Sequence, residues 1–196
     1  MDVTATREKL RVLGDREWPE EWGFEQAGDD FLGWSHRYRL DTPLDTSEVE
    51  SFERQHAVAL PADYRQFLIE LGNGGAGPGY GIWPLGEGEN GPLPDEMLAN
   101  LSQPFAHTEP WNENGLPDEE YYSYSVIAGA LEIATDGDAL YYFLVLNGPA
   151  AGQVWYDRRT DGKGLGPVRD AGGAIMTFGP WYEAWLGLAL DRFASE

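Results

Sequence analysis

One long stretch of this chain carries acidic residues and no basic ones. Between Arg65 and Arg158 there is no lysine or arginine. Carboxylates in such a stretch stay in water, pair with cations from the flanks, or meet another molecule. A solvated face explains each of them singly, but the whole block, interleaved with aromatic residues, favours a binding surface. The fourteen acidic residues are Glu70, Glu87, Glu89, Asp95, Glu96, Glu109, Glu113, Asp118, Glu119, Glu120, Glu132, Asp136, Asp138 and Asp157.

The whole chain is strongly acidic as well. Its 196 residues include 34 Asp and Glu against 13 Lys and Arg, which gives a formal net charge of -21. This charge repels phosphate backbones and anionic lipid surfaces, so we expect neither nucleic acid nor membrane as a partner. It favours basic proteins, whose approach it steers over long distances.

The composition indicates a folded domain. Hydrophobic residues make up 42% and aromatic residues 13% of the chain, which is enough for a core. There is no cysteine, which excludes disulfides and suits a reducing compartment. The N-terminus lacks the apolar segment of a signal peptide, and the longest apolar runs are too short to cross a bilayer. We therefore expect a cytoplasmic protein.

Two consecutive helices form the strongest pattern. Ser47 and Glu50 fit a capping box, and Val49, Phe52 and His56 follow on one face of the first helix. The second helix starts near Pro61, which suits a first turn. Its apolar positions, at helical spacing, are Tyr64, Phe67, Leu68 and Leu71. The run from Gly72 to Gly75 ends it in residues that tolerate left-handed backbone.

Strands follow the helices. Short strands are predicted for residues 82–85, 123–127 and 130–134, and a turn at Asp136 to Asp138. Residues 139–146 are apolar on both alternating faces, as in a central strand, and residues 153–157 return after a hairpin loop. Consecutive strands with such short connections predict an antiparallel meander.

A last helix is predicted near the C-terminus. Pro180 suits its first turn, and Trp181, Trp185 and Leu188 form one stripe that would pack on the sheet. The fold class is therefore α+β, with N-terminal helices, an antiparallel β-meander sheet, and a C-terminal helix packed on the sheet. We divide the chain into an aromatic-rich extension over residues 1–43, containing Trp18, Trp22, Phe24, Phe31 and Trp34, and a domain over residues 44–196.

The sequence lacks the usual signatures of catalysis and of cofactor binding. Its three histidines, His36, His56 and His107, have no metal-ligand spacing, and there is no nucleophile elbow. The glycines at 77, 79 and 81 do not follow a predicted strand, and Pro78 lies among them. Both features differ from a dinucleotide-binding fingerprint. The acidic turns lack the spacing of a calcium loop. We expect no cofactor, no metal and no enzymatic activity.

Three short motifs resemble the SUKH superfamily. They are Val49-Glu50-Ser51-Phe52-Glu53, then Leu60-Pro61-Ala62-Asp63-Tyr64-Arg65-Gln66-Phe67-Leu68, then Asn73-Gly74-Gly75. The family includes yeast regulators of cell-wall assembly and many bacterial immunity proteins. The resemblance implies a binding module that in bacteria commonly neutralises a toxin, often a nuclease, and it implies this by association with the fold.

We therefore predict an immunity-type protein that binds a basic toxin domain through its acidic surface. The alternative is a regulatory scaffold or adaptor for a host protein, and an enzyme or small-molecule binder ranks below both. The interface is predicted on the loop from Glu87 to Tyr122 and the turn at Asp136 to Asp138, with aromatic anchors in the loop. Its residues are Glu87, Glu89, Glu109, Trp111, Glu113, Asp118, Glu119, Glu120, Tyr121, Tyr122, Asp136 and Asp138.

Overall fold

A four-stranded antiparallel sheet forms the centre of the protein. The structure, a computed structural model, describes residues 1–15 and 36–194. The strands are β3 (Ala130–Gly137), β4 (Leu140–Val145), β5 (Val154–Arg158) and β6 (Gly164–Pro167), and they lie side by side in chain order. The predicted meander is confirmed, and β6 extends it by a strand that the sequence did not reveal.

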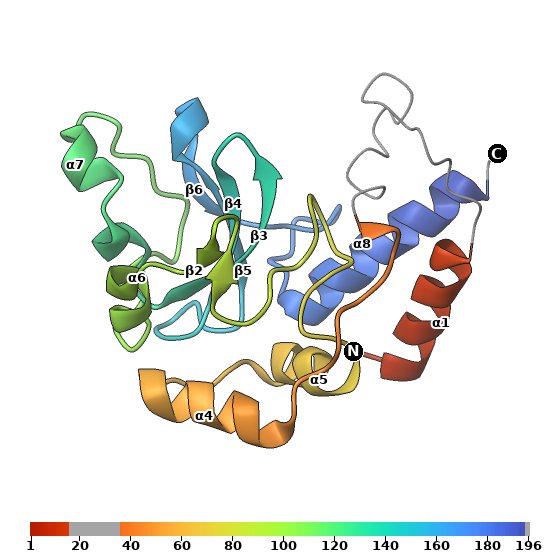
Figure 1. Cartoon of the computed structure of the whole chain (residues 1–196). Coiled ribbons are helices and arrows are strands. Elements are labelled where there is room, and N and C mark those ends of the chain that lie inside the picture. The colour runs from red at the N-terminus through yellow and green to blue at the C-terminus, as the bar shows by residue number, and fades with distance from the viewer. Residues whose placement is uncertain (16–35, 195–196) are drawn as a thin grey trace.

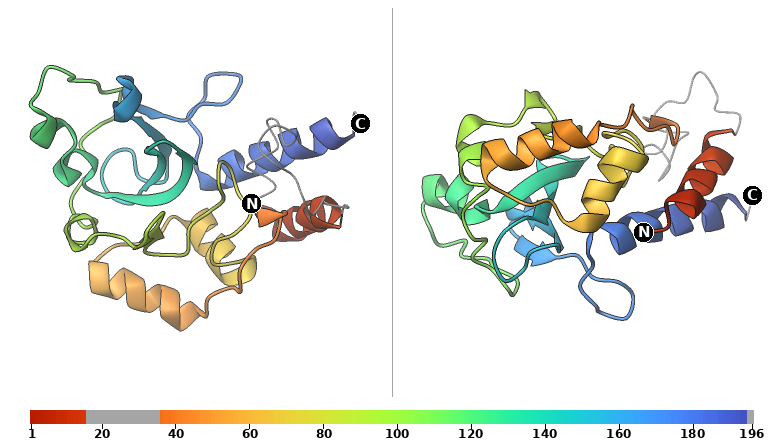
Figure 2. Two further views of the ribbon diagram at one scale, coloured as in Figure 1. Left: turned by 45° about the horizontal axis from the view of Figure 1, so that its top comes forward. Right: turned by 90° about the horizontal axis from the view of Figure 1, so that it is seen from below.

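Helices from both ends of the chain complete the α+β fold, as predicted (Figure 1). The long helices are α1 (Val3–Gly14), α4 (Thr46–His56), α5 (Ala62–Glu70) and α8 (Phe178–Phe193). Helix α1 packs against α8, away from the sheet (Figure 2). The predicted aromatic stretch from Trp18 to Trp34 lies outside the described residues, so the division at residue 43 stays a prediction.

The remaining elements are short; all but η3, which connects β5 to β6, lie in sequence between α5 and the sheet. They are β1 (Glu87–Gly88), β2 (Gly91–Pro92), α6 (Asp95–Ala99), α7 (Asp118–Tyr121) and the 3-10 helices η2 (Tyr124–Ile127) and η3 (Arg159–Asp161). Strands β1 and β2 pair as a hairpin. Because β1 contacts β3, the hairpin lies over one edge of the main sheet.

Three local predictions were wrong. The capping box of α4 uses Asp45, whose backbone N–H donates to Glu48 Oε2 at 2.7 Å, because Asp45 is the last residue with extended backbone. Residues 124–127 form η2 instead of a strand, since the Ser123 hydroxyl accepts from the Ser125 N–H and caps a helical turn. The segment 82–85 contributes only single bridges, from Ile82 to Gly75 and to Ala134.

The Asn-Gly-Gly motif joins α5 to the start of the hairpin. Gly74 and Gly75 have positive φ values of 98° and 93°, which favour glycine. Gly75 exchanges two backbone hydrogen bonds with Ile82, at 2.9 and 2.8 Å, and Asn73 Oδ1 accepts from the Leu85 N–H at 2.8 Å. A side chain on Gly75 would stand 2.6 Å from the Arg39 carbonyl, so glycine here also lets the segment around Arg39 and Leu40 pack closely against the motif.

The first turns of helix α8 pack aromatic side chains against α5 and one face of the sheet. Tyr182 is fully buried, and its hydroxyl donates to the Ala76 carbonyl at 2.8 Å. Trp181 contacts Tyr142 of β4. The predicted stripe was wrong in one member, because Leu188 is 72% exposed and the buried face runs instead through Leu186 and Ala189. In the described residues, no helix is long and apolar enough to cross a lipid bilayer.

Asp63 of α5 caps the N-terminus of α8, and its removal should destabilise the fold. The Gly179 N–H donates to Asp63 Oδ2 at 2.8 Å across 116 positions of sequence. Asp63→Ala leaves this N–H without an acceptor at the positive end of the helix, so we expect a loss of about 1–2 kcal/mol in the free energy of unfolding. Urea denaturation measures it. Asp63→Asn, which keeps an oxygen acceptor, should lose less; equal losses would contradict the cap.

Candidate partner-binding groove

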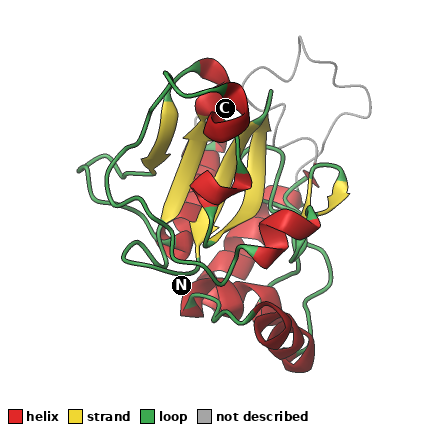
Figure 3. Ribbon diagram, turned by 90° about the vertical axis from the view of Figure 1, so that its left-hand side faces the viewer, coloured by secondary structure: helices red, strands yellow, loops and turns green. Residues whose placement is uncertain are grey.

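The face of the sheet opposite α8 carries a groove. Side chains alternate along β4, so Tyr142 points toward Trp181 while Tyr141 and Phe143 point to the other face. Two adjoining cavities of about 250 and 180 Å³ lie over that face and share Tyr141 and Glu132. We call these two cavities together the sheet groove. Figure 3 turns this side of the molecule, with α6 and α7, toward the viewer.

The walls of the sheet groove come from the acidic middle of the chain. The β1–β2 hairpin closes the smaller cavity, with Glu89 at its turn. Tyr122, which follows α7, and Tyr124 of η2 border the larger one. Tyr122 is 45% exposed, which makes it one of the most exposed large hydrophobic side chains of the described chain.

Glu132 lies at the floor, where the two cavities meet. It pairs with Phe143 in the register of β3 and β4 and is only 9% exposed. Burial, and after it the charge of Glu89, raise the pKa of this carboxyl from 4.5 to about 7. The indole N–H of Trp83 and the backbone of Glu89 favour the charged form and oppose these two effects. Glu132 is therefore about half ionised at neutral pH.

Two further observations show how tightly Glu132 is enclosed. A side chain on Gly88 of the hairpin would stand 2.9 Å from Glu132 Oε1, so glycine lets the hairpin approach the carboxylate. Trp83 Nε1 is buried and lies near enough to Glu132 to favour its ionised form, but outside hydrogen-bonding geometry. An ionisable group and an indole donor that lacks a hydrogen-bond partner thus share one enclosed region.

A buried ion pair closes the other end of the sheet groove. Arg159 donates to both carboxylate oxygens of Asp157, from Nε at 3.0 Å and from a terminal nitrogen at 2.7 Å. Its other terminal nitrogen donates to the Tyr121 carbonyl at 2.7 Å, and its guanidinium lies 5.8 Å from the ring centre of Tyr122. Both partners are less than 10% exposed. The pair fixes the end of α7 to the sheet.

Two of the predicted aromatic anchors hold the acidic loop in place. Tyr121 is buried, stacks on Trp111 at 5.3 Å, and donates from its hydroxyl to Asn112 Oδ1 at 2.7 Å. Trp111 exchanges two backbone hydrogen bonds with Leu165 of β6, at 2.9 and 2.8 Å. The structure gives both residues a role inside the fold, and their part in partner binding stays a prediction.

Most of the predicted acidic site residues are exposed on the elements around the sheet groove. None of these carboxylates forms an ion pair with another described residue. The basic residues nearest in sequence are already engaged, since Arg158 and Lys163 both contact Asp161. Together with Asp95 and Glu96 of α6, the exposed set comprises Glu87, Glu89, Glu109, Glu113, Asp118, Glu119 and Glu120.

The predicted turn is separated from the groove in part. Asp136 accepts hydrogen bonds from Tyr142 at 2.9 Å and Tyr156 at 2.6 Å, and Tyr142 lies on the face of the sheet that contacts Trp181 of α8. Asp138 and Ala139 form the tip of the β3–β4 hairpin, both with positive φ. Ala139 lines the larger cavity and Asp138 is exposed. The structure therefore brings Asp138, but not the Asp136 side chain, to the groove side.

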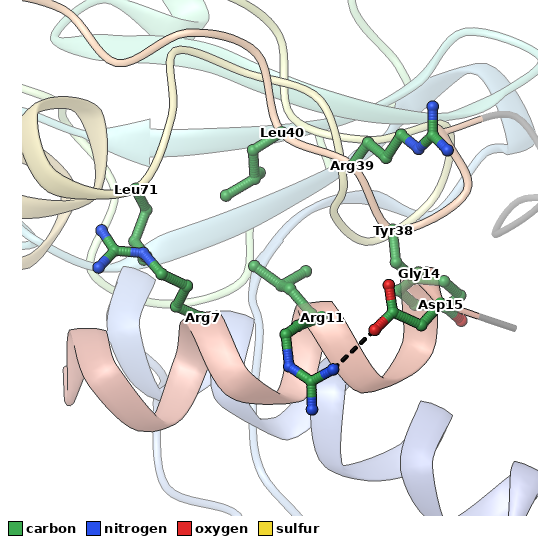
Figure 4. Close-up of a pocket in the computed structure, with 9 residues that line it drawn as sticks. Arg7, Arg11, Gly14, Asp15, Tyr38, Arg39, Leu40 and Leu71 are labelled. Atoms are coloured by element: carbon green, nitrogen blue, oxygen red, sulfur yellow. Dashed lines mark hydrogen bonds and ion pairs between the residues drawn. The ribbon is translucent and has the colours of Figure 1, made fainter.

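Two other hollows lie outside the sheet groove. One, of about 310 Å³, lies between α1 and Tyr38–Leu40 (Figure 4). Two of its arginines are already engaged, since Arg11 pairs with Glu8 and Asp15 and Arg7 donates to the Glu70 carbonyl. The Arg39 side chain points away from Arg7 and Arg11. The other, of about 530 Å³, is an apolar depression along α8 that includes the exposed Leu188.

The histidines contact backbone groups or aromatic rings. His36 has a pKa lowered to about 4 by burial, and its two nitrogens contact the Gly77 carbonyl and the Tyr38 N–H. His107 contacts the Val126 carbonyl at 2.9 Å, and His56 lies against the Phe52 ring. In residues 1–15 and 36–194, no three His, Asp or Glu side chains come together as they would around a metal ion.

Sequence reasoning missed the floor of the groove. Glu132, Asp157 and Arg159 were not predicted as site residues, and neither were Tyr124 and Tyr141. One signal was available for Glu132, a single acid inside an otherwise apolar strand at residues 130–134. Nothing comparable marks Arg159, whose burial follows from the position of α7.

Comparisons with known proteins identify the family. No curated protein sequence and no solved structure matches the chain at a significant level. The model of the SMI1 / KNR4 family (SUKH-1) matches residues 43–168, which is well over half of the chain and runs from α4 through β6. The match contains the two helices, the Asn-Gly-Gly motif, the acidic loop and the whole sheet. The chain therefore belongs to the SMI1 / KNR4 family (SUKH-1).

Proposed function

We propose that this chain is a non-catalytic binding protein that neutralises a basic toxin domain, as a bacterial immunity protein does. The acidic side around the sheet groove is its binding face. The observation that carries the proposal is the set of nine exposed carboxylates on this side, none of which is paired with a described residue. An uncompensated field of this kind attracts a positively charged surface.

Family membership supports a binding role. The SUKH family is generally one of binding and immunity proteins, and the matched region contains every element of the acidic side. Tyr122 supplies an exposed aromatic ring at the edge of the groove, the residue type that tends to anchor interfaces. Enzymes that grip phosphate groups carry basic sites, so a nuclease toxin would meet a complementary surface here.

Co-expression in bacteria tests the proposal directly. The candidate toxin is the C-terminal domain of a large protein encoded next to this chain. Cells that make the toxin should survive when this chain is co-expressed, and the two proteins should co-purify. If no such neighbouring gene exists and the chain instead binds a host regulatory protein, the regulatory-scaffold hypothesis replaces the immunity hypothesis.

Neutralising the charges of α7 should slow association with the partner. The variant Asp118→Asn, Glu119→Gln, Glu120→Gln removes three exposed charges. We expect the association rate at low salt to fall about tenfold and its salt dependence to flatten, because steering acts mainly on association. Stopped-flow mixing with the toxin domain at several salt concentrations measures both.

A matched variant separates local from total charge. Asp41→Asn, Glu50→Gln, Glu70→Gln removes the same number of exposed charges from the other side of the molecule, near α4 and α5. It should leave the association rate within about twofold of the original. Equal effects of the two triple variants would show that the acidic side is not the binding face.

A further inference from the structure

We infer that the sheet groove is a socket for one lysine or arginine side chain of the partner, whose cationic head pairs with the Glu132 carboxylate. The inference rests on the proposed function and names the chemistry of the same face. It follows from the shape of the groove, from the charges inside it and from the aromatic rings along it.

The charges in the groove select a cation. Glu132 opens into both cavities, and Glu89 lies at the hairpin turn of the smaller one. The cation present, Arg159, is already held by Asp157 and by the Tyr121 carbonyl, so it leaves Glu132 without a counter-ion among the described residues. An anion entering the groove would be repelled, whereas a cation would meet a carboxylate that is 9% exposed.

The walls suit the rest of a long basic side chain. Tyr122 and Tyr124 border the larger cavity, and Tyr141 and Phe143 form its floor. Apolar walls hold the methylene groups of lysine or arginine, and ring faces attract the charged head. Each cavity is smaller than the about 300 Å³ typical of pockets for drug-sized ligands. A single side chain on a protein surface fits this space.

Pairing should make recognition depend on pH. The groups that face Glu132 are Glu89 from the hairpin, Tyr141 from β4, Asp157 from β5 with its partner Arg159, and the Trp83 indole. A bound cation favours the ionised carboxylate, so binding should release a proton. Because the pKa of free Glu132 is about 7, affinity should rise about tenfold between pH 6 and pH 8 as the carboxylate ionises.

Small model compounds test the socket without a partner protein. The probes are N-acetyl-lysine-N-methylamide and N-acetyl-arginine-N-methylamide, with N-acetyl-norleucine-N-methylamide as the uncharged control. The Trp83 indole N–H resonance, assigned with Trp83→Phe, reports on the groove because it lies beside Glu132. Both cationic probes, at millimolar concentration and pH 8, should shift this resonance and those of Tyr122 and Tyr124. Comparing the lysine and arginine probes shows which head group the groove binds more tightly.

The Glu132→Gln variant decides the outcome. It should weaken cationic-probe binding at least fivefold at pH 8 and abolish its pH dependence, whereas Glu70→Gln, an exposed change on α5 outside the acidic side, should leave both unchanged. Equal shifts with the norleucine probe, or unaltered binding to Glu132→Gln, overturn the socket. A toxin that still binds Glu132→Gln with full affinity overturns the socket and leaves the proposed function standing. If the cationic probes bind in the groove but the chain has no toxin partner, the socket stands and the proposed function is overturned.

Discussion

The Glu132→Gln variant is expected to be more stable than the natural protein above pH 7, by up to about 3 kcal/mol in the free energy of unfolding. The pKa of Glu132 is raised from 4.5 to about 7 in the folded state, mainly by burial. Between these two values the folded chain binds more protons than the unfolded chain, so the contribution of Glu132 to stability falls as the pH rises. Glutamine has no charge to lose and keeps the shape.

Denaturant unfolding of both proteins at pH 5 and pH 8 measures this effect. The two stabilities should be close at pH 5 and should diverge at pH 8. His36 acts in the opposite direction, because its lowered pKa of about 4 makes stability fall below pH 6.5, but it is present in both proteins and cancels in the difference. Glu96→Gln is the control and should show no divergence. A difference that is the same at both pH values would contradict the burial of a carboxylate with a raised pKa.

The combined outcome links stability to function. A buried carboxylate without a cation is costly, and a glutamine in its place would remove that cost. If the same substitution stabilises the fold and weakens binding of cations, Glu132 lowers the free energy of unfolding and is kept for binding. The Glu132 carboxylate would then lack a counter-ion in the free protein and gain one in the complex.

The sequence predicted the elements whose patterns are local and strong. Residues with helical spacing after Pro61 gave α5, and the long apolar run at residues 139–146 gave β4. Strand β6 was missed because Gly164–Pro167 has no alternating pattern and is positioned by pairing with β5. Leu188 was misplaced because the buried face of α8 runs through Leu186 and Ala189, and this face is set by packing on α1 and α5, which the sequence does not reveal.

The candidate site divides in the same way. Exposed acids such as Asp118 and Glu119 follow from charge counting, because a carboxylate without a nearby cation stays in water. The environment of Glu132 could not be predicted, since its burial depends on the β1–β2 hairpin folding over β3. Tyr121 and Tyr122 are adjacent in sequence, yet Tyr121 is buried because its ring stacks on Trp111, whereas Tyr122 is exposed, and the sequence reveals neither contact.

Breaking the Asp157–Arg159 pair should have the largest effect on stability. Both side chains are buried, so Arg159→Met leaves an uncompensated carboxylate and Asp157→Asn leaves an uncompensated guanidinium. Each single variant should lose about 3–5 kcal/mol in the free energy of unfolding. Urea denaturation at pH 7 measures these losses, and a loss below about 1 kcal/mol in either would contradict a buried pair.

The double variant separates charge from attachment of the loop. Asp157→Asn with Arg159→Met removes both charges and keeps the oxygen that accepts from the Arg159 backbone N–H at 3.0 Å, so it should lose less than either single variant. Hydrogen exchange at Tyr121 and Tyr122 should nevertheless be faster in Arg159→Met and in the double variant, because both lack the guanidinium that holds the Tyr121 carbonyl. Asp157→Asn alone keeps that guanidinium and should retain slower exchange there. If exchange instead followed stability across all three variants, Arg159 would stabilise the core without positioning α7, and the acidic side would owe its shape to the stacking of Trp111 on Tyr121.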